Sequence, residues 1–392
     1  MNIAIDIDDT LTESFDYFLP FVAEYFGADV DELKKKNISY SNLPPEWKKD
    51  EIGFCRAYYD KVVASTPFKS DAAWGVQKLR DLGHRIVIIT ARIDELYTDP
   101  YKTTREELKN GGIVYDKLIC TLDKANACMN EKISVLIDDS PENCDSVISR
   151  GIPVLLFSSK ANQKKKTEYL RVGNWTDAIE TLRQIERGYP DKKNAEILLA
   201  AAEELNPGPW GNHCRVAALC AQKIAEACSM DAEKAYVLAL LHDIGRRFRV
   251  RDLGHIYYGH QYMQRLGFRQ VAKVCLTHSF PNQDFGIYIG KIDIPENEAA
   301  DACDLLGKMK YDDYDRLIQI CDALAGNESF LDIEERMADV KRRYGNYPQA
   351  QWTKNVELKQ YFEEKIHGSI YELLHGVTIN DVDIISREVE EK

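Results

Sequence analysis

A short apolar run at the start of the chain leads directly into a cluster of acids. Residues 2–5 predict a buried strand, and Asp6, Asp8 and Asp9 follow it without a break. Because side chains in a strand repeat their direction every second residue, Asp6 and Asp8 project into the same small volume. Two carboxylates that close repel each other unless a cation or a proton lies between them. The pattern therefore predicts a cation-bound acid pair at the carboxyl end of a strand, where α/β folds place catalysis.

The first half of the chain alternates strand-like and helix-like segments, which favours a parallel sheet flanked by helices. The predicted strands are Ile3–Ile7, Arg85–Thr90, Lys117–Cys120, Ser134–Ile137 and Pro153–Phe157. Residues 14–70 depart from this alternation because they are rich in aromatic side chains and are broken by Pro44 and Pro45. We expect them to form a helical cap over the strand ends. The prediction is a Rossmann-like α/β domain over residues 1–187.

The character of the sequence changes after a short linker at residues 188–193. From there the apolar residues follow helical spacing, and few of them are β-branched. The predicted helices are 194–206, 212–229, 231–243, 256–266, 269–278, 314–325, Ile333–Arg343 and Val356–Ile366. A break at Tyr344–Pro348 separates the last two of these helices. We expect an all-α domain over residues 194–392, with residues 330–392 as a C-terminal helical extension whose role the sequence leaves open.

Bulk properties limit the class of protein. The chain has 392 residues, enough for two domains, and a net charge of -13 at pH 7. That charge argues against a partner such as duplex nucleic acid, because phosphate backbones attract basic surfaces. No apolar stretch approaches the roughly 18 residues of a membrane helix, and no signal peptide is recognisable. The ten cysteines show no paired CxxC spacing, so we expect reduced thiols in a cytoplasmic protein. The oligomeric state stays open.

Four motifs of the first half resemble the haloacid dehalogenase superfamily of phosphatases. They are the acid run Asp6–Leu11, Thr90 at the end of the second predicted strand, Lys124, and the pair Asp138-Asp139 after the fourth. The motifs occur in the family's order over residues 1–157, each after its expected strand. Any one of them alone is weak, but the combination is specific. The resemblance implies a phosphatase that passes the phosphoryl group through an aspartate.

The resemblance also implies a role for each residue. Asp6 would be the nucleophile that forms an aspartyl-phosphate, and Asp8 would protonate the leaving alcohol and later activate water. Thr90 would donate a hydrogen bond to a transferring oxygen, and Lys124 would neutralise charge there. Lys117 is a competitor for the role of Lys124, which the motif spacing favours.

Magnesium is the cofactor that the resemblance implies for this half. Asp6, Asp139 and the backbone carbonyl of Asp8 would hold the ion, because Mg²⁺ prefers oxygen ligands. Asp138 would bond a metal-bound water or Lys124. A calcium loop is the alternative for the first acids. It is disfavoured because the position of the last loop ligand is Tyr17 rather than Glu and the acids follow a strand.

Finer motifs narrow the predicted substrate. Residues 89–92, Asp123-Lys124, 136–143 and 151–157 look like the cytosolic 5'(3')-deoxyribonucleotidase branch. This resemblance implies a small phosphorylated substrate of the nucleotide class, with Arg92 as a substrate-binding residue. Aromatic side chains of the cap could stack a base, although most of them are expected to form the core of the cap. Phosphomonoesters other than nucleotides remain the alternative.

The second half carries histidines and aspartates in an arrangement that resembles HD-domain metal-dependent phosphohydrolases over about 194–330. His213 lies early in a predicted helix, His242 and Asp243 form the pair that names the family, and Asp322 lies in a later helix. The resemblance implies that these four form a mononuclear metal site. The candidates for the additional ligands of binuclear members are His255, preferred over His260, and His278.

Imidazole and carboxylate together suit one or two ions of Mn, Fe, Zn or Ni. The resemblance implies that such an ion activates a water, which attacks a nucleotide phosphate ester or anhydride without a covalent intermediate. Arg246 could grip a substrate phosphate, or it could be a charge at a helix end. A nucleotide-sensing regulatory module that controls the phosphatase is the alternative for this half. A nucleic-acid end-processing enzyme is disfavoured by the acidic balance and the absence of a phosphate-binding kinase loop.

Overall fold

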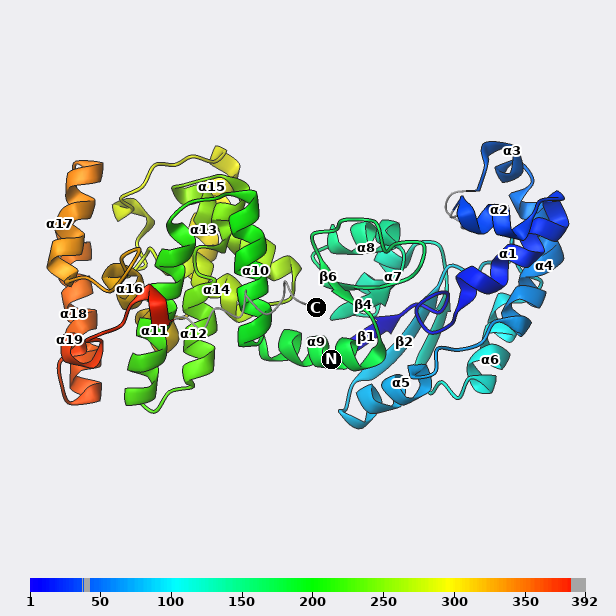
Figure 1. The fold of residues 1–392 in the computed structure, drawn as a ribbon, viewed down its shortest axis with the longest axis horizontal. Coiled ribbons are helices and arrows are strands. Elements are labelled where there is room, and N and C mark those ends of the chain that lie inside the picture. The colour runs from blue at the N-terminus through cyan, green and yellow to red at the C-terminus, as the bar shows by residue number, and fades with distance from the viewer. Residues whose placement is uncertain (37, 39–42, 382–392) are drawn as a thin grey trace. The chain divides into compact units, whose positions relative to one another are not determined.

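The computed structural model describes residues 1–36, 38 and 43–381. Residues 37 and 39–42 of the predicted cap and residues 382–392 of the predicted extension lie outside the described residues. The chain divides into two compact units, Met1–Glu186 and Arg187–Lys392 (Figure 1). Within the described residues, no helix combines the length and the apolar character needed to span a membrane.

The first unit is built on a parallel sheet of six strands in the order β3-β2-β1-β4-β5-β6. The strands are β1 Asn2–Ile5, β2 Arg85–Thr90, β3 Lys117–Cys120, β4 Val135–Asp138, β5 Val154–Phe157 and β6 Leu170–Val172. The predicted α/β class is confirmed, and β6 was not predicted. The predicted first strand was too long, because Ile7 already lies in the turn and its carbonyl accepts the N–H groups of residues 10–12.

Helices cover both faces of this sheet, as a parallel sheet with apolar strands requires. Alternate side chains such as Ala4, Val87 and Leu136 pack under α7 and α8. On the opposite face, Phe157 of β5 contacts Trp175 of α9, with 5.6 Å between the ring centroids. The helices of this part are α5 Ala72–Asp81, α6 Pro100–Asn110, α7 Lys124–Asn130, α8 Pro141–Ile148 and α9 Trp175–Arg187.

The predicted helical cap is present and emerges from the carboxyl end of β1 (Figure 1). Its helices are α1 Ser14–Phe26, α2 Val30–Lys35, α3 Pro45–Lys48 and α4 Glu51–Ser65. Aromatic rings form much of its interior, with Phe54 fully buried among Phe18, Tyr25 and Tyr58. Most of the cap's aromatic residues therefore serve its own core, as expected from the sequence.

The second unit is all-α, as predicted. Its α-helices are α10 Lys192–Leu205, α11 Trp210–Ala227, α12 Ala232–Leu240, α13 Leu253–Arg265, α14 Arg269–Thr277, α15 Glu296–Lys308, α16 Asp313–Leu324, α17 Ile333–Tyr344, α18 Gln349–Ile366 and α19 Ile370–Leu373. Three short 3-10 helices accompany them: η2 Ile244–Phe248, η3 Phe285–Ile287 and η4 Ile379–Asp381. Helix α15 was not predicted. The predicted linker is shorter than expected, because Asp191 caps α10 by accepting the Asn194 N–H.

The C-terminal extension is tied to the loop that follows α16. Ser329 pairs with Thr378, and the Ile379 N–H donates to the Glu328 carbonyl at 2.7 Å. Leu374 and Val377 of the same segment are buried. The extension, as far as residue 381, where the described residues end, is therefore packed against the rest of this unit.

Gly75 lets α5 approach α9 closely, because a Cβ at this position would lie 2.6 Å from the Trp175 Cβ. We expect Gly75→Ala to lower the free energy of unfolding of the first unit by about 1–3 kcal/mol, as overpacking does. Gly307→Ala is the matched control, since its Cβ would meet nothing within 4 Å. It should raise the stability of its unit by up to about 1 kcal/mol. Equilibrium unfolding in urea measures both, and an unchanged Gly75→Ala protein would contradict this close packing.

Candidate active sites

Three carboxylates meet where β1 and β4 end. Ile5 and Ile137 are partners in the parallel register, and the Asp6 N–H donates to the Ile137 carbonyl at 2.9 Å. One oxygen from each of Asp6, Asp138 and Asp139 lies within 4.8 Å of the others. The fold thus brings together acids that are more than a hundred residues apart in the chain.

Lys124, the first residue of α7, enters this group from the side. Its Nζ donates to Asp6 at 2.6 Å and to Asp138 at 2.7 Å. Burial alone would lower the pKa of Lys124, but the charges of Asp138 and Asp6 outweigh it and raise the pKa, so the ammonium stays charged. Lys117, the competing candidate, instead pairs with Glu131 at 2.5 Å.

One lysine does not balance the charge of three acids, of which Asp6 and Asp138 are buried and Asp139 is half-buried. Burial raises the pKa of Asp6 to about 7. Burial and the neighbouring carboxylates raise the pKa of Asp139 well above its usual range. A hard divalent cation would relieve this repulsion, and Mg²⁺ prefers such oxygen ligands. The residues present therefore fit an ion held by Asp6, Asp139 and the carbonyl of Asp8.

Asp8 stands beside this group and has different partners. Its Oδ1 accepts hydrogen bonds from the Ser14 hydroxyl at 2.9 Å and from Arg92 at 3.1 Å. Burial would raise the pKa of Asp8, but the charge and hydrogen bonds of Arg92 hold it below its usual value. The side chain of Asp8 is 47% exposed, whereas that of Arg92 is 2% exposed. Asp8 can therefore reach a bound molecule directly.

Thr90 lies at the end of β2 with its side chain fully buried. Its Oγ1 has no hydrogen-bond partner among the described residues. A buried hydroxyl without a partner is costly, and it is satisfied when a ligand oxygen accepts its proton. Thr90 is thus placed to serve an oxygen that the protein itself does not supply.

The floor of a cavity of about 340 Å³ is formed by Asp6, Asp8, Asp139 and Lys124. Its apolar wall comes from the cap and from the segment after β2, and consists of Phe15, Phe18, Tyr59, Val62, Val63, Leu96 and Tyr97. A charged floor beside an apolar wall suits a ligand with an anionic end and a flat or apolar body.

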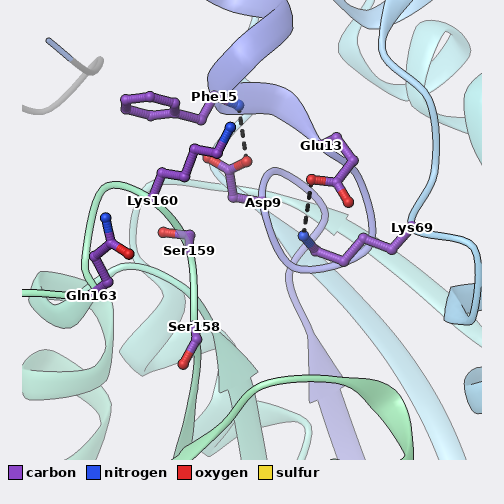
Figure 2. A pocket seen from close by; sticks show the side chains of 8 residues that line it. All are labelled: Asp9, Glu13, Phe15, Lys69, Ser158, Ser159, Lys160 and Gln163. Atoms are coloured by element: carbon purple, nitrogen blue, oxygen red, sulfur yellow. Dashed lines mark hydrogen bonds and ion pairs between the residues drawn. The ribbon is translucent and has the colours of Figure 1, made fainter. Parts of the chain in front are cut away.

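A second cavity, of about 250 Å³, also borders Asp9 (Figure 2). Asp9 adopts a left-handed φ of 55°, and its Oδ1 accepts the Phe15 N–H at 2.8 Å. Burial raises the pKa of Asp9 to about 6. The lining side chains, labelled in Figure 2, are Asp9, Glu13, Phe15, Lys69, Ser158, Ser159, Lys160 and Gln163. The formal charges of its two acids and two lysines cancel, so this cavity selects neither an anion nor a cation.

The second unit contains two adjoining groups of possible metal ligands. His213 on α11, His242 and Asp322 on α16 place one ligand atom each within 4.8 Å of one another. His213 Nε2 lies 2.9 Å from Asp322 Oδ1, and His242 Nε2 lies 3.7 Å from the same oxygen. Helix α12 ends at Leu240, so the predicted helix 231–243 was too long and His242 lies in the turn that follows. That turn directs the side chains of His242 and Asp243 into the core of the helical unit.

Asp243 forms the second group with His255 and His278. Its Oδ1 lies 3.0 Å from His255 Nε2 and 3.5 Å from His278 Nε2. His260, the competing candidate, instead bonds the Ala272 carbonyl through Nδ1 at 2.9 Å. The structure thus brings all six predicted residues of this half together, with Asp243 beside His242 at the junction of the two groups.

Three of these histidines are oriented for metal binding. The Nδ1 atoms of His213, His242 and His278 lie 3.2, 2.6 and 2.9 Å from the carbonyl oxygens of Ala325, Ala239 and Cys275. Donation of Nδ1–H to a backbone carbonyl leaves Nε2 as the free ligand atom. His242 Nε2 is buried, and within the described part of the chain it has no hydrogen-bond partner. The donor set fits a divalent transition metal.

The pKa values of two histidines in the second unit are shifted strongly, in opposite directions. Burial would lower the pKa of His242, but Asp243 and Asp322 raise it to about 9. Burial and the charge of His242 lower the pKa of His278 to about 3. A metal ion therefore has to displace the proton of His242, which couples metal binding to pH.

Sequence reasoning missed three partners of these sites. Cys214 Sγ lies within 4.8 Å of ligand atoms of His242 and Asp243, and no spacing in the sequence singled it out. Ser14 and Glu107 were also missed, although an acid on the buried stripe of α6 is a sign of a buried ion pair. Arg246, predicted to bind substrate, forms an ion pair with Asp243.

Comparison with known proteins agrees with this geometry. Residues 1–186 match the family model "5' nucleotidase, deoxy (Pyrimidine), cytosolic type C protein", and residues 210–327 match the model of the HD domain. The chain is 24% identical over 186 residues to a protein of Chlorobaculum tepidum named "Putative 5'(3')-deoxyribonucleotidase", covering 46% of this chain and 89% of that protein.

Two of the solved structures that are similar to part of this chain are named as hydrolases of the haloacid dehalogenase type. One, from Streptococcus pneumoniae, is 12% identical with a TM-score of 0.35 and covers 45% of this chain and 96% of that chain. Another, from Ehrlichia chaffeensis, is 16% identical with a TM-score of 0.29 and covers 47% of this chain and 96% of that chain.

The chain is therefore a hydrolase that acts on phosphate esters. Its first unit is a haloacid dehalogenase-type phosphatase domain of the deoxyribonucleotidase family, and its second contains an HD phosphohydrolase domain. Both families are generally dependent on divalent metal ions.

Gly245 controls the geometry of the HD group, because η2 crosses α13 at this point. A Cβ here would lie 1.9 Å from the His255 carbonyl oxygen and 2.6 Å from the Gly259 nitrogen, both backbone atoms. We expect Gly245→Ala to push His255 away from Asp243 and to destabilise the unit by about 3 kcal/mol. Metal content measured by mass spectrometry should fall. Gly368→Ala, with only one ordinary contact at 3.9 Å, is the control and should keep its metal. Full metal loading of Gly245→Ala would contradict this account.

Proposed function

We propose that this protein is bifunctional. The first domain, residues 1–187, hydrolyses phosphomonoesters of the nucleotide 5'-phosphate class through an aspartyl-phosphate on Asp6. The second domain, residues 194–392, hydrolyses a nucleotide phosphate ester or anhydride at its histidine–aspartate site. The observation that supports the first activity best is the joint placement of Asp6, Asp8 and Lys124 on the floor of one cavity, where Lys124 donates to Asp6 at 2.6 Å.

The proposed reaction begins when a carboxylate oxygen of Asp6 attacks the substrate phosphorus. The bond from phosphorus to the leaving oxygen breaks, and Asp8 gives that oxygen a proton, which Asp8 takes up when the phosphate anion binds beside it and its negative charge opposes that of Arg92. Asp8, now a carboxylate, takes a proton from water, which attacks the phosphorus and returns Asp6 to its free form with release of phosphate. Lys124 and Thr90 stabilise the negative charge that spreads over the transferring oxygens.

Magnesium is the proposed cofactor of this domain. When bound at Asp6, Asp139 and the Asp8 carbonyl, it would screen the repulsion between the nucleophile and the phosphate dianion. Lys124 donates to Asp6 at 2.6 Å, and its charge opposes the rise in the Asp6 pKa that burial causes, so it favours the carboxylate form. The charge of the site would then approach balance before the substrate arrives.

The shape of the cavity supports the nucleotide substrate class. Phe15, Phe18, Tyr59 and Tyr97 provide flat apolar surface beside the charged floor, and bases pack well against aromatic rings. The matched nucleotidase family and the name of the Chlorobaculum protein point to the same class. The proposed substrate lies with its phosphate at Asp6 and its base against the cap.

The second activity is supported by the completeness of the ligand set in the HD domain. His213, His242, Asp243 and Asp322 would hold one transition-metal ion, and His255 and His278 would extend the site to two. Bound there, Mn, Fe, Zn or Ni would supply an activated water at neutral pH. Arg246 next to Asp243 is the proposed contact for a substrate phosphate. The alternative is a domain that senses a nucleotide and regulates the phosphatase.

We expect Asp6→Asn to lower kcat for nucleoside monophosphates by about 10⁴-fold or more, because it removes the nucleophile. Asp8→Asn should lower kcat by about 10²–10⁴-fold on nucleotides, but much less in the phosphorylation step with p-nitrophenyl phosphate, whose leaving group needs no proton. The phosphorylated protein should then accumulate in Asp8→Asn and be visible by intact mass.

The control for these two variants is Asp145→Asn, an exposed aspartate on α8 that should leave the rate unchanged. Monoester hydrolysis that survives in Asp6→Asn would refute the assignment of the nucleophile. An Asp8→Asn enzyme that is equally slow on both esters and forms no adduct would refute the role of Asp8.

We expect His242→Ala to lose the transition metal of the HD domain and its hydrolysis of nucleoside di- or triphosphates, while the Asp6-dependent activity is kept. Metal analysis and a substrate screen with each metal measure the two effects, with the exposed His375→Asn as control. If His242→Ala removed no hydrolysis but changed the Asp6-dependent rate, the regulatory alternative would replace the catalytic one.

A further inference from the structure

Arg92 lies directly beneath the acids of the first domain and is 1% exposed. Its Nε and one terminal nitrogen donate to Asp8 at 3.4 and 3.1 Å. The same terminal nitrogen donates to Glu107 at 3.2 Å, and the other donates to Glu107 and, at 3.4 Å, to Thr104. All three guanidinium nitrogens are therefore engaged by the protein itself.

Glu107 is the counterpart of this arginine and comes from α6. Its side chain is 4% exposed, and both of its oxygens accept hydrogen bonds from Arg92. A buried charge without a partner is strongly destabilising, so Arg92 and Glu107 are stable in this place only as a pair. A planar guanidinium between two carboxylates fixes the orientation of both, which a lysine could not do.

We propose that Arg92 and Glu107 form a positioning pair that holds Asp8, and that Arg92 does not bind the substrate phosphate. This replaces the substrate-binding role expected for Arg92 from the sequence, and it rests on the function proposed for Asp8. Oδ1 of Asp8 is held by Ser14 and Arg92, whereas among the described residues Oδ2 has only the 3.4 Å contact from Arg92. The geometry leaves Oδ2 as the oxygen that meets the leaving group.

The pair also explains why Arg92, although it lies close to the acids, does not neutralise charge on the substrate phosphate as Lys124 does. Its positive charge is matched by Glu107, so it contributes little net charge to the cavity. The attraction for the phosphate dianion is then left to Lys124 and the bound cation. Displacement of a general acid lowers the reaction rate rather than the substrate affinity. A misplacement of about 1 Å can lower the rate about 100-fold.

The double variant Arg92→Met/Glu107→Met tests the proposal, because it removes the pair without changing the net charge of the site. Replacing a buried ion pair with apolar side chains of similar volume commonly keeps the fold, which thermal unfolding verifies. We expect kcat for nucleoside monophosphates to fall about 10–100-fold. KM and the inhibition constant of inorganic phosphate should change less than about threefold. Glu107→Gln should likewise lower kcat with little change in KM. Glu106→Gln, at an exposed neighbouring position on α6, should behave as wild type.

Other outcomes would overturn the proposal. If the inhibition constant of phosphate rose tenfold or more while kcat was kept, Arg92 would be a phosphate ligand. If the folded double variant kept its full kcat, the pair would have no positioning role. Arg92→Lys gives an independent reading should Glu107→Gln fail to fold, and it should lose kcat although it keeps the charge. Activity in Asp6→Asn would refute the proposed function itself, which separates the two failures.

Discussion

Repulsion among buried carboxylates is the constraint on which the first domain depends. Asp6, Asp138 and Asp139 are brought together by the parallel pairing of β1 and β4, and burial and nearby carboxylates raise the pKa of Asp6 and of Asp139. Lys124 offsets part of the negative charge by bonding Asp6 and Asp138 at once. The rest of the charge needs a cation. The same repulsion that makes the site costly to fold thus favours the binding of a divalent cation.

The second domain meets the same constraint with different side chains. Its two aspartates are surrounded by four imidazoles, and the Nδ1 atoms of His213, His242 and His278 lie against backbone carbonyls at helix ends, which leaves Nε2 as the ligand atom. The carbonyl of Ala325 that holds His213 belongs to the loop tied to Thr378, so the C-terminal extension supports the site from outside the matched HD region. Oxygen ligands in one domain and mixed nitrogen and oxygen ligands in the other suit hard and borderline metals respectively.

Much of the architecture could be predicted because it follows from local patterns. Apolar runs gave the first five strands, and helical spacing gave most of the helices of the second unit. Strand β6 was missed because three residues at a sheet edge carry too little pattern. The end of α12 was placed too late because the apolar spacing continues through Leu241 into His242, whereas the turn there is decided by the packing of the metal-ligand group.

The sequence by itself determined which ligand types are present, their order and the two classes of chemistry, because motifs are local and their spacing follows strands and helices. Only the tertiary structure decided which charges meet. It paired Arg92 with Glu107 and Asp8, placed Lys124 rather than Lys117 among the acids, and set Cys214 beside the HD pair. The physical reason is that these contacts join side chains from different elements, and their energies depend on burial and distance that only the packed chain defines.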